Sequence, residues 1–145
     1  MVAIDYMKIV ESSLNEIYIF SASTLCFLDV NRGARENLGY TLEELQELTP
    51  LDIKPEYTPE QFETLILPLR QREREKIEFN TYHRRKDGTT YPVEVHLQLR
   101  DFDAEPIFVA IIVDTSERDE LFNRSMELGR IFQRSLNEVY IYDIE

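Results

Sequence analysis

Alternating apolar and polar residues predict three long strands in the C-terminal half of the chain. Residues 77–84 alternate strictly, which places every second side chain on one face of a strand. The dipeptide Asp87-Gly88 follows and favours a tight hairpin turn. Residues 91–99 alternate again, and residues 106–114 are apolar on both faces, as a central strand requires.

The N-terminal half predicts a short hairpin followed by short helices. Residues 16–30 alternate on either side of a Ser-Ala-Ser-Thr turn, which suggests two short strands. In residues 31–74, Thr41 begins a capping box with a glutamate three residues on, and Thr58 caps a second helix that opens with proline. Pro68 falls inside this second helical pattern, so we expect a kink or an early end there.

These elements assemble into an α+β fold: one antiparallel sheet with short helices on one face. Amphipathic helical patterns flank it, at residues 4–14 and 121–136. A helix with a narrow apolar stripe must bury that stripe, either against its own domain or against the same helix of a second chain. Both alternatives stay open at this point.

A repeat links the two ends of the chain. Residues 9–20 (IVESSLNEIYIF) and 131–142 (IFQRSLNEVYIY) are identical at seven of twelve positions. The offset suits one whole domain with its linker and is too long for a solenoid repeat. We therefore expect an N-terminal helix at residues 1–15, a domain core at 16–115, an exit helix at 116–135 and the start of a second domain copy at 136–145.

Composition narrows the function classes. The net charge of −12 opposes binding to a phosphate backbone, so no nucleic-acid partner is expected. A single cysteine, Cys26, excludes an internal disulfide and a cysteine-rich zinc site. No apolar run is long enough to cross a membrane and the start lacks a secretion signal, so we expect a cytoplasmic segment without direct membrane insertion. A membrane anchor elsewhere in a parent protein would leave no trace here.

Three local motifs, in this order, resemble the PAS family. Residues 31–34 (NRGA) leading to 38–40 (LGY) are similar to the family's helix after the second strand. Residues 84–89 (RRKDGT) resemble the hairpin between its third and fourth strands, and residues 113–118 (VDTSER) resemble the junction between its last strand and the signalling helix. The resemblance implies a PAS-like five-stranded antiparallel sheet, with short helices on one face and amphipathic helices at both ends.

PAS relatives that bind a ligand hold it between the sheet and the short helices, so the resemblance implies a pocket there. The expected lining residues are Ile19, Leu38, Phe62, Leu65, Phe79, Thr81, His83, Tyr91, Val93, Val95 and Ile111. The expected signal relay at the exit of the domain consists of Asp114, Thr115 and Ser116.

The ligand itself stays unknown, although two cofactor classes are disfavoured. Covalent flavin photochemistry needs an Asn-Cys pair on a pocket helix, whereas Cys26 lies on an early strand. Haem needs an axial ligand, usually histidine, and residues 58–74 contain none. His83 faces inward, where it either hydrogen-bonds a ligand or bonds a neighbour and closes the hairpin. His96 lies on the other face, so the two histidines do not converge on a metal.

Nothing in the sequence supports catalysis, because the paired carboxylates lie on polar helix faces and no glycine-rich phosphate loop occurs. Two functions remain. The first is a sensory domain that signals through its exit helix to an output module in the same chain, of the histidine kinase or diguanylate cyclase type. The second is a ligand-free dimerisation and spacer module. Either way we expect a homodimer through the flanking helices.

Overall fold

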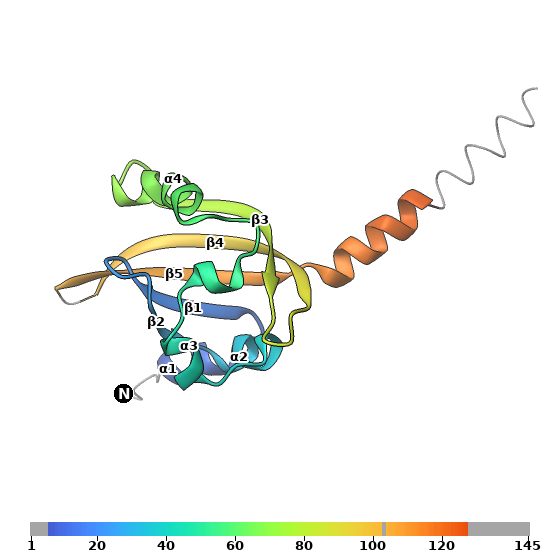
Figure 1. The fold of residues 1–145 in the computed structure, drawn as a ribbon, viewed down its shortest axis with the longest axis horizontal. Coiled ribbons are helices and arrows are strands. Elements are labelled where there is room, and N and C mark those ends of the chain that lie inside the picture. Colours follow the sequence, from blue (N-terminus) through green and yellow to red (C-terminus); the bar gives the residue numbers. More distant parts are fainter. Residues whose placement is uncertain (1–5, 103, 128–145) are drawn as a thin grey trace, which may run out of the picture. The chain divides into compact units, whose positions relative to one another are not determined.

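One five-stranded antiparallel sheet forms the body of the protein (Figure 1). The structure, a computed structural model, describes residues 6–102 and 104–127. The strands are β1 (Glu16–Ser21), β2 (Phe27–Val30), β3 (Lys76–Arg84), β4 (Thr90–Phe102) and β5 (Glu105–Asp114). Their order across the sheet is β2-β1-β5-β4-β3, and every neighbouring pair is antiparallel. The predicted α+β fold is confirmed.

In the unit that contains the sheet, the helices lie between β2 and β3 in the chain, except for one that precedes the sheet. They are α1 (Tyr6–Ser12), α2 (Arg32–Leu38), α3 (Leu42–Gln46), the 3-10 helix η1 (Pro50–Ile53) and α4 (Pro59–Arg70). Figure 1 shows α2 and α3 beside β1 and β2, and α4 beside β3 and β4. Both predicted N-caps are confirmed, because Thr41 and Thr58 each complete a capping box.

Helix α4 continues two residues past Pro68, to Arg70. The helix therefore does not end at Pro68, where the sequence pattern predicts a kink or an early end. Pro68 stands in the last turn, where its missing N–H removes one hydrogen bond and the chain is about to leave the helix in any case. The next residue, Leu69, is fully buried and keeps this last turn packed on the core.

The core lies between the sheet and the helices. Its largest members on the central strands are Tyr18 and Phe20 on β1 and Phe108 and Ile112 on β5. They share one face because the register pairs Tyr18 with Ala110 and Phe20 with Phe108.

Two predicted pocket residues lie on the other face of the sheet. Ile19 is half-buried there, and Ile111 is 38% exposed. The expectation that they line the space under the helices is wrong. Both strands are apolar on both faces, so alternation alone did not say which face turns inward, and the larger Tyr18 and Phe20 take the buried side.

The chain divides into two compact units after Asp114. In the second unit, residues 116–127 are helical, and Thr115 begins this helix by accepting a backbone hydrogen bond from Asp119. No helix within the described residues is long and apolar enough to span a membrane. The predicted second domain copy at 136–145 lies outside the described residues, and the proposed domain boundaries remain predictions.

Candidate functional site

Five polar side chains meet in the apolar core between the sheet and the helices. Glu16, Tyr18, Lys54, His83 and Tyr91 are each at most 5% exposed, and we refer to these five as the buried polar cluster. Fully buried charged residues are rare unless they are paired. A cluster of this kind in a small core therefore marks the candidate functional site.

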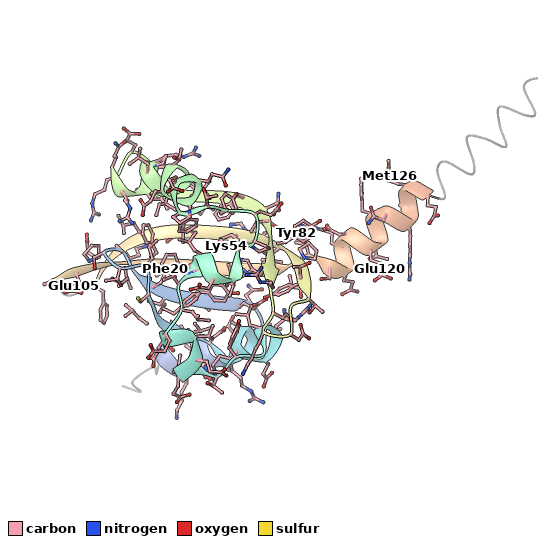
Figure 2. All side chains as sticks on the ribbon, viewed as in Figure 1. Phe20, Lys54, Tyr82, Glu105, Glu120 and Met126 are labelled. Carbon is pink, nitrogen blue, oxygen red and sulfur yellow. The ribbon has the colours of Figure 1, made fainter. Side chains whose placement is uncertain are left out.

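Four separate segments bring the cluster together. Glu16 and Tyr18 occupy alternate positions on the inner face of β1. His83 and Tyr91 are direct cross-strand partners on β3 and β4, close to the predicted Asp-Gly turn. Lys54 follows η1, whose last turn closes through a hydrogen bond from the Lys54 amide to the Leu51 carbonyl. In Figure 2, Lys54 lies beside this short helix in front of the sheet.

A continuous line of hydrogen bonds connects the five side chains. Lys54 Nζ lies 2.6 Å from His83 Nε2, and His83 Nδ1 lies 3.1 Å from the Tyr18 hydroxyl. The Tyr18 hydroxyl donates to Glu16 Oε1 at 3.1 Å. Tyr91 donates to the same carboxylate oxygen at 2.8 Å. Glu16 is thus linked to Lys54 through two intervening side chains.

The line continues from Glu16 to the last residue of β5. The side-chain amide of Asn37, on α2, donates to Glu16 Oε2 at 3.2 Å and to Asp114 Oδ2 at 3.1 Å. Arg85 holds Asn37 in place, since its Nε donates to the Asn37 carbonyl oxygen at 3.0 Å. The Arg85 guanidinium also lies over the Tyr91 ring, 4.4 Å from its centroid.

Burial changes the protonation behaviour of Lys54 and His83. Loss of hydration lowers the pKa of Lys54 to about 7, although the negative charge of Glu16 opposes this shift. Burial and the nearby Lys54 charge hold the pKa of His83 well below its usual value. The ring of Phe79 lies 5.6 Å from Lys54 Nζ and adds a weak attraction for the charged form.

The other end of the cluster is shifted in the opposite sense. Burial raises the pKa of Glu16, against the effect of the three side chains that donate hydrogen bonds to it. Burial, together with the Glu16 charge, also raises the pKa values of Tyr18 and Tyr91. Both tyrosines are therefore neutral donors, and the pKa of about 7 places the charge change of Lys54 near neutral pH.

The fold agrees with a comparison of the sequence against known families. The sequence profile of the PAS domain matches residues 15–117, which is most of the chain. This chain belongs to the PAS family. Among curated protein sequences, none matches it significantly.

Solved structures of PAS domains share this fold. A PAS domain of an HTR-like protein from Haloarcula marismortui is 24% identical, with a TM-score of 0.68 over 75% of this chain and 88% of the other. A PAS domain from Desulfitobacterium hafniense is 25% identical, with a TM-score of 0.64 over 74% and 98%. A PAS domain of a two-component sensor histidine kinase is 15% identical, with a TM-score of 0.61 over 75% and 92%.

Most predicted pocket residues of the PAS domain face its core. The fully buried ones are Leu38, Phe62, Thr81, His83, Tyr91, Val93 and Val95, while Leu65 and Phe79 are partly buried against them. Thr81 donates to a carboxylate oxygen of Glu56 at 2.8 Å. Whether these residues bind a ligand stays a prediction.

Sequence reasoning missed Glu16, Tyr18 and Lys54. A signal for the first two was present, because the repeat keeps them: Glu138 and Tyr140 occupy the matching positions in the second copy. Lys54 gave no such signal. It stands next to Pro55 in an irregular segment, where a lysine is ordinarily solvent-exposed.

His96 belongs to a separate cluster on the opposite face of the sheet. Its Nδ1 lies 3.3 Å from a carboxylate oxygen of Glu78, and its Nε2 lies 3.5 Å from one of Glu94. Ligand atoms of these three residues lie within 4.8 Å of one another, the spacing of a candidate metal site. The two ring nitrogens thus lie near different carboxylates, and these contacts hold His96 on this face, away from the buried polar cluster.

Proposed function

We propose that this PAS domain is a sensory module, which registers a change in its core and passes it through Asp114 to the helix that follows. The observation that carries the proposal is the hydrogen-bonded line from Lys54 through Glu16 and Asn37 to Asp114. Asp114 is the last residue of β5, and helical residues 116–127 follow it almost directly. A change in any hydrogen bond of this line therefore alters how firmly the C-terminal end of β5 is held.

The alternative is a ligand-free spacer and dimerisation module. A spacer needs only a packed apolar core, and replacing a buried ionic group by apolar residues of similar volume is often neutral or stabilising. The buried Lys54 and Glu16 therefore favour the sensory function. Among the described residues, no buried side-chain nitrogen or oxygen lacks a hydrogen-bond partner. The five side chains of the cluster therefore bond to one another, and the sensory proposal rests on these bonds.

The output of the signal lies outside this chain. PAS domains are typically non-catalytic, and the structural neighbours include domains of sensor histidine kinases. We propose a histidine kinase or a diguanylate cyclase as the effector, by analogy with the family alone. A small molecule bound among the predicted pocket residues would act on the same hydrogen-bonded line, since His83 and Tyr91 belong to both.

The test removes the Asn37 side chain, which connects Glu16 to Asp114. In Asn37→Ala, Glu16 and Asp114 lose their shared donor, so we expect backbone amides in residues 116–127 to exchange hydrogen several-fold faster. Gln46→Ala is the matched control, because Gln46 also donates a side-chain hydrogen bond, to the Leu28 carbonyl oxygen, away from the cluster. Exchange that is equal in the wild type and both variants would favour the spacer instead.

A further inference from the structure

The charge of Lys54 dictates the direction of the hydrogen bonds in the buried polar cluster. An ammonium group has three donors and no acceptor, so His83 Nε2 must accept from it. A neutral imidazole carries one proton, which then resides on Nδ1 and is donated to the Tyr18 hydroxyl oxygen. Tyr18 has one proton to give and donates it to Glu16. With Lys54 charged, every bond points toward Glu16.

Loss of one proton removes this constraint. A neutral Lys54 amine has a lone pair and can accept from His83 Nε2–H. His83 Nδ1 then becomes an acceptor, and the Tyr18 hydroxyl turns to donate to it. One proton leaves for solvent, the single ring proton of His83 changes nitrogen, and Tyr18 and Glu16 keep their covalent protonation states. Glu16 Oε1 retains Tyr91 as a donor but loses Tyr18.

We propose that this PAS domain is a pH sensor in which loss of the Lys54 proton reverses the hydrogen bonds of the buried polar cluster and releases Glu16 from Tyr18. The inference deepens the proposed sensory function, on which its signalling part rests, by naming the proton as the input. Among the described residues, each buried side-chain nitrogen and oxygen has at least one hydrogen-bond partner, so the proton acts on bonds that are already formed.

The groups around Lys54 determine the pH at which it loses its proton. Of those it faces, Glu16 supplies a negative charge, His83 stays neutral because burial depresses its pKa, and the Phe79 ring is uncharged. At the far end, Tyr18 and Tyr91 remain protonated, and Arg85 lies over the Tyr91 ring. The pKa of about 7 places the charge change of Lys54 in this range, and burial also raises the pKa of Glu16 above its usual value.

The reversal reaches the exit of the domain through Asn37. Glu16 and Asp114 share the two N–H groups of the Asn37 side chain. When Tyr18 turns away, the Glu16 carboxylate depends more strongly on its remaining donors, Tyr91 and Asn37. The hydrogen bond from Asn37 to Glu16 then strengthens relative to the bond from Asn37 to Asp114. This changes how firmly Asp114, the last residue of β5, is held.

Nitrogen-15 NMR of the histidine rings tests the switch directly, because the chain has two histidines and the two tautomers differ in ring-nitrogen shifts. We expect His83 to carry its proton on Nδ1 at about pH 6 and increasingly on Nε2 by about pH 8.5.

Three variants support this measurement. His96→Gln assigns the signals, since His96 lies outside the buried polar cluster. Lys54→Met should abolish the transition. Glu16→Gln should move its midpoint to lower pH, because the negative charge that favours charged Lys54 is gone.

A His83 tautomer that does not change across this pH range in the folded wild type would overturn the switch. If Lys54→Met does not fold, Glu16→Gln decides, and an unmoved midpoint contradicts Lys54 as the titrating group. Backbone amide shifts of residues 116–127, recorded in the same titration, separate the two proposals. A His83 transition with unresponsive amides upholds the switch and contradicts the sensory function.

Discussion

At the scale of single residues, one buried side chain can join several segments of this PAS domain. Asn31 is 1% exposed and makes four hydrogen bonds. Its Oδ1 accepts from the amides of Ile17 at 2.9 Å and Ala34 at 3.3 Å, so it also caps α2. Its Nδ2 donates to the carbonyl oxygens of Val10 and Asn15, both at 2.9 Å. This side chain ties the chain entering β1 to the start of α2.

Asn31→Asp tests the two donated bonds while keeping the helix cap. The substitution places a carboxylate oxygen against the carbonyls of Val10 and Asn15, which both lose the Asn31 donor, although the Val10 carbonyl still accepts from the Ser13 amide. We expect the free energy of unfolding to fall by about 2–3 kcal/mol at neutral pH, measured in urea. Asn123→Asp is the control on an exposed helical position and should change stability by less than about 0.5 kcal/mol. Equal losses in both variants would contradict a specific role of Asn31.

Lys54 should make stability depend on pH. Its pKa is about 7 in the folded protein against 10.5 as an ordinary value, so the unfolded chain binds more protons between these two pH values. The free energy of unfolding therefore rises with pH in this window, by at most about 1.4 kcal/mol per unit from this group. Below it, the cost of burying charged Lys54 is fully present.

Urea unfolding of Lys54→Met over the same window checks this slope. The variant should lack the Lys54 contribution and gain most over the wild type at about pH 6–7, where burial of the charge costs most. Lys76→Met, at an exposed surface position on β3, should keep the wild-type slope. Parallel pH profiles for Lys54→Met and the wild type would show that Lys54 is charged in both the folded and the unfolded state.

At the scale of elements, the end of α2 and the β3–β4 turn depend on each other. Gly39 ends α2 with a φ of 82°, a left-handed conformation that side chains disfavour. Its amide donates to the Arg35 carbonyl oxygen, and the Lys86 amide donates to that of Leu38. This pair of bonds positions Arg85, and with it Asn37, above the buried polar cluster.

Two glycine-to-alanine substitutions distinguish the cost of a strained backbone conformation from the cost of steric crowding. Gly39→Ala should destabilise the domain by about 1–2 kcal/mol, because alanine is strained in the left-handed region. Gly33 lies within α2, where an added Cβ would meet its nearest atom, the Ser13 carbonyl oxygen, at an ordinary 3.5 Å. Gly33→Ala should therefore be neutral or stabilising by up to about 1 kcal/mol. Thermal unfolding measures both, and a stable Gly39→Ala would contradict the role of this helix end.

At the scale of the whole molecule, apolar side chains remain exposed in both flanking segments of the single chain. Leu14 next to α1 is fully exposed, and Ile9 within α1 is 56% exposed. In the second unit, Leu121, Phe122 and Met126 are also exposed on helical residues 116–127. Exposed apolar groups at this density favour association, and they support the proposed homodimer through the flanking helices.

Phe122→Ser tests that dimer. We expect the mass of the wild type in light scattering to depend on protein concentration, as a dimer that dissociates on dilution requires. The protein concentration at the midpoint of dissociation should be about ten-fold higher for the variant, because its dimer is weaker. Phe102→Ser is the matched control, since Phe102 is an equally exposed phenylalanine at the end of β4. Deletion of residues 1–12 tests the N-terminal segment in the same way. A wild type that stays monomeric at every concentration rules against the dimer.

Local patterns were sufficient for most of the fold. Thr41 and Thr58 cap their helices as predicted, Asp87-Gly88 turns the β3–β4 hairpin, and the alternation in residues 77–84 places His83 on the inner face. Each of these features depends on residues within a few positions of one another. Pro68 was the local exception, because its effect depends on how near the helix end lies.

What the sequence by itself determined is the order of strands and helices, their caps and turns, and from these the PAS fold. What only the tertiary structure decided is which face of β1 and β5 turns inward, and therefore that Glu16 and Tyr18, rather than Ile19, lie under the helices. It also decided that Lys54 meets His83 in the core. The physical reason is distance along the chain. Alternation and capping act between near neighbours, whereas the buried polar cluster joins residues from four segments, and strand register and burial alone bring these together.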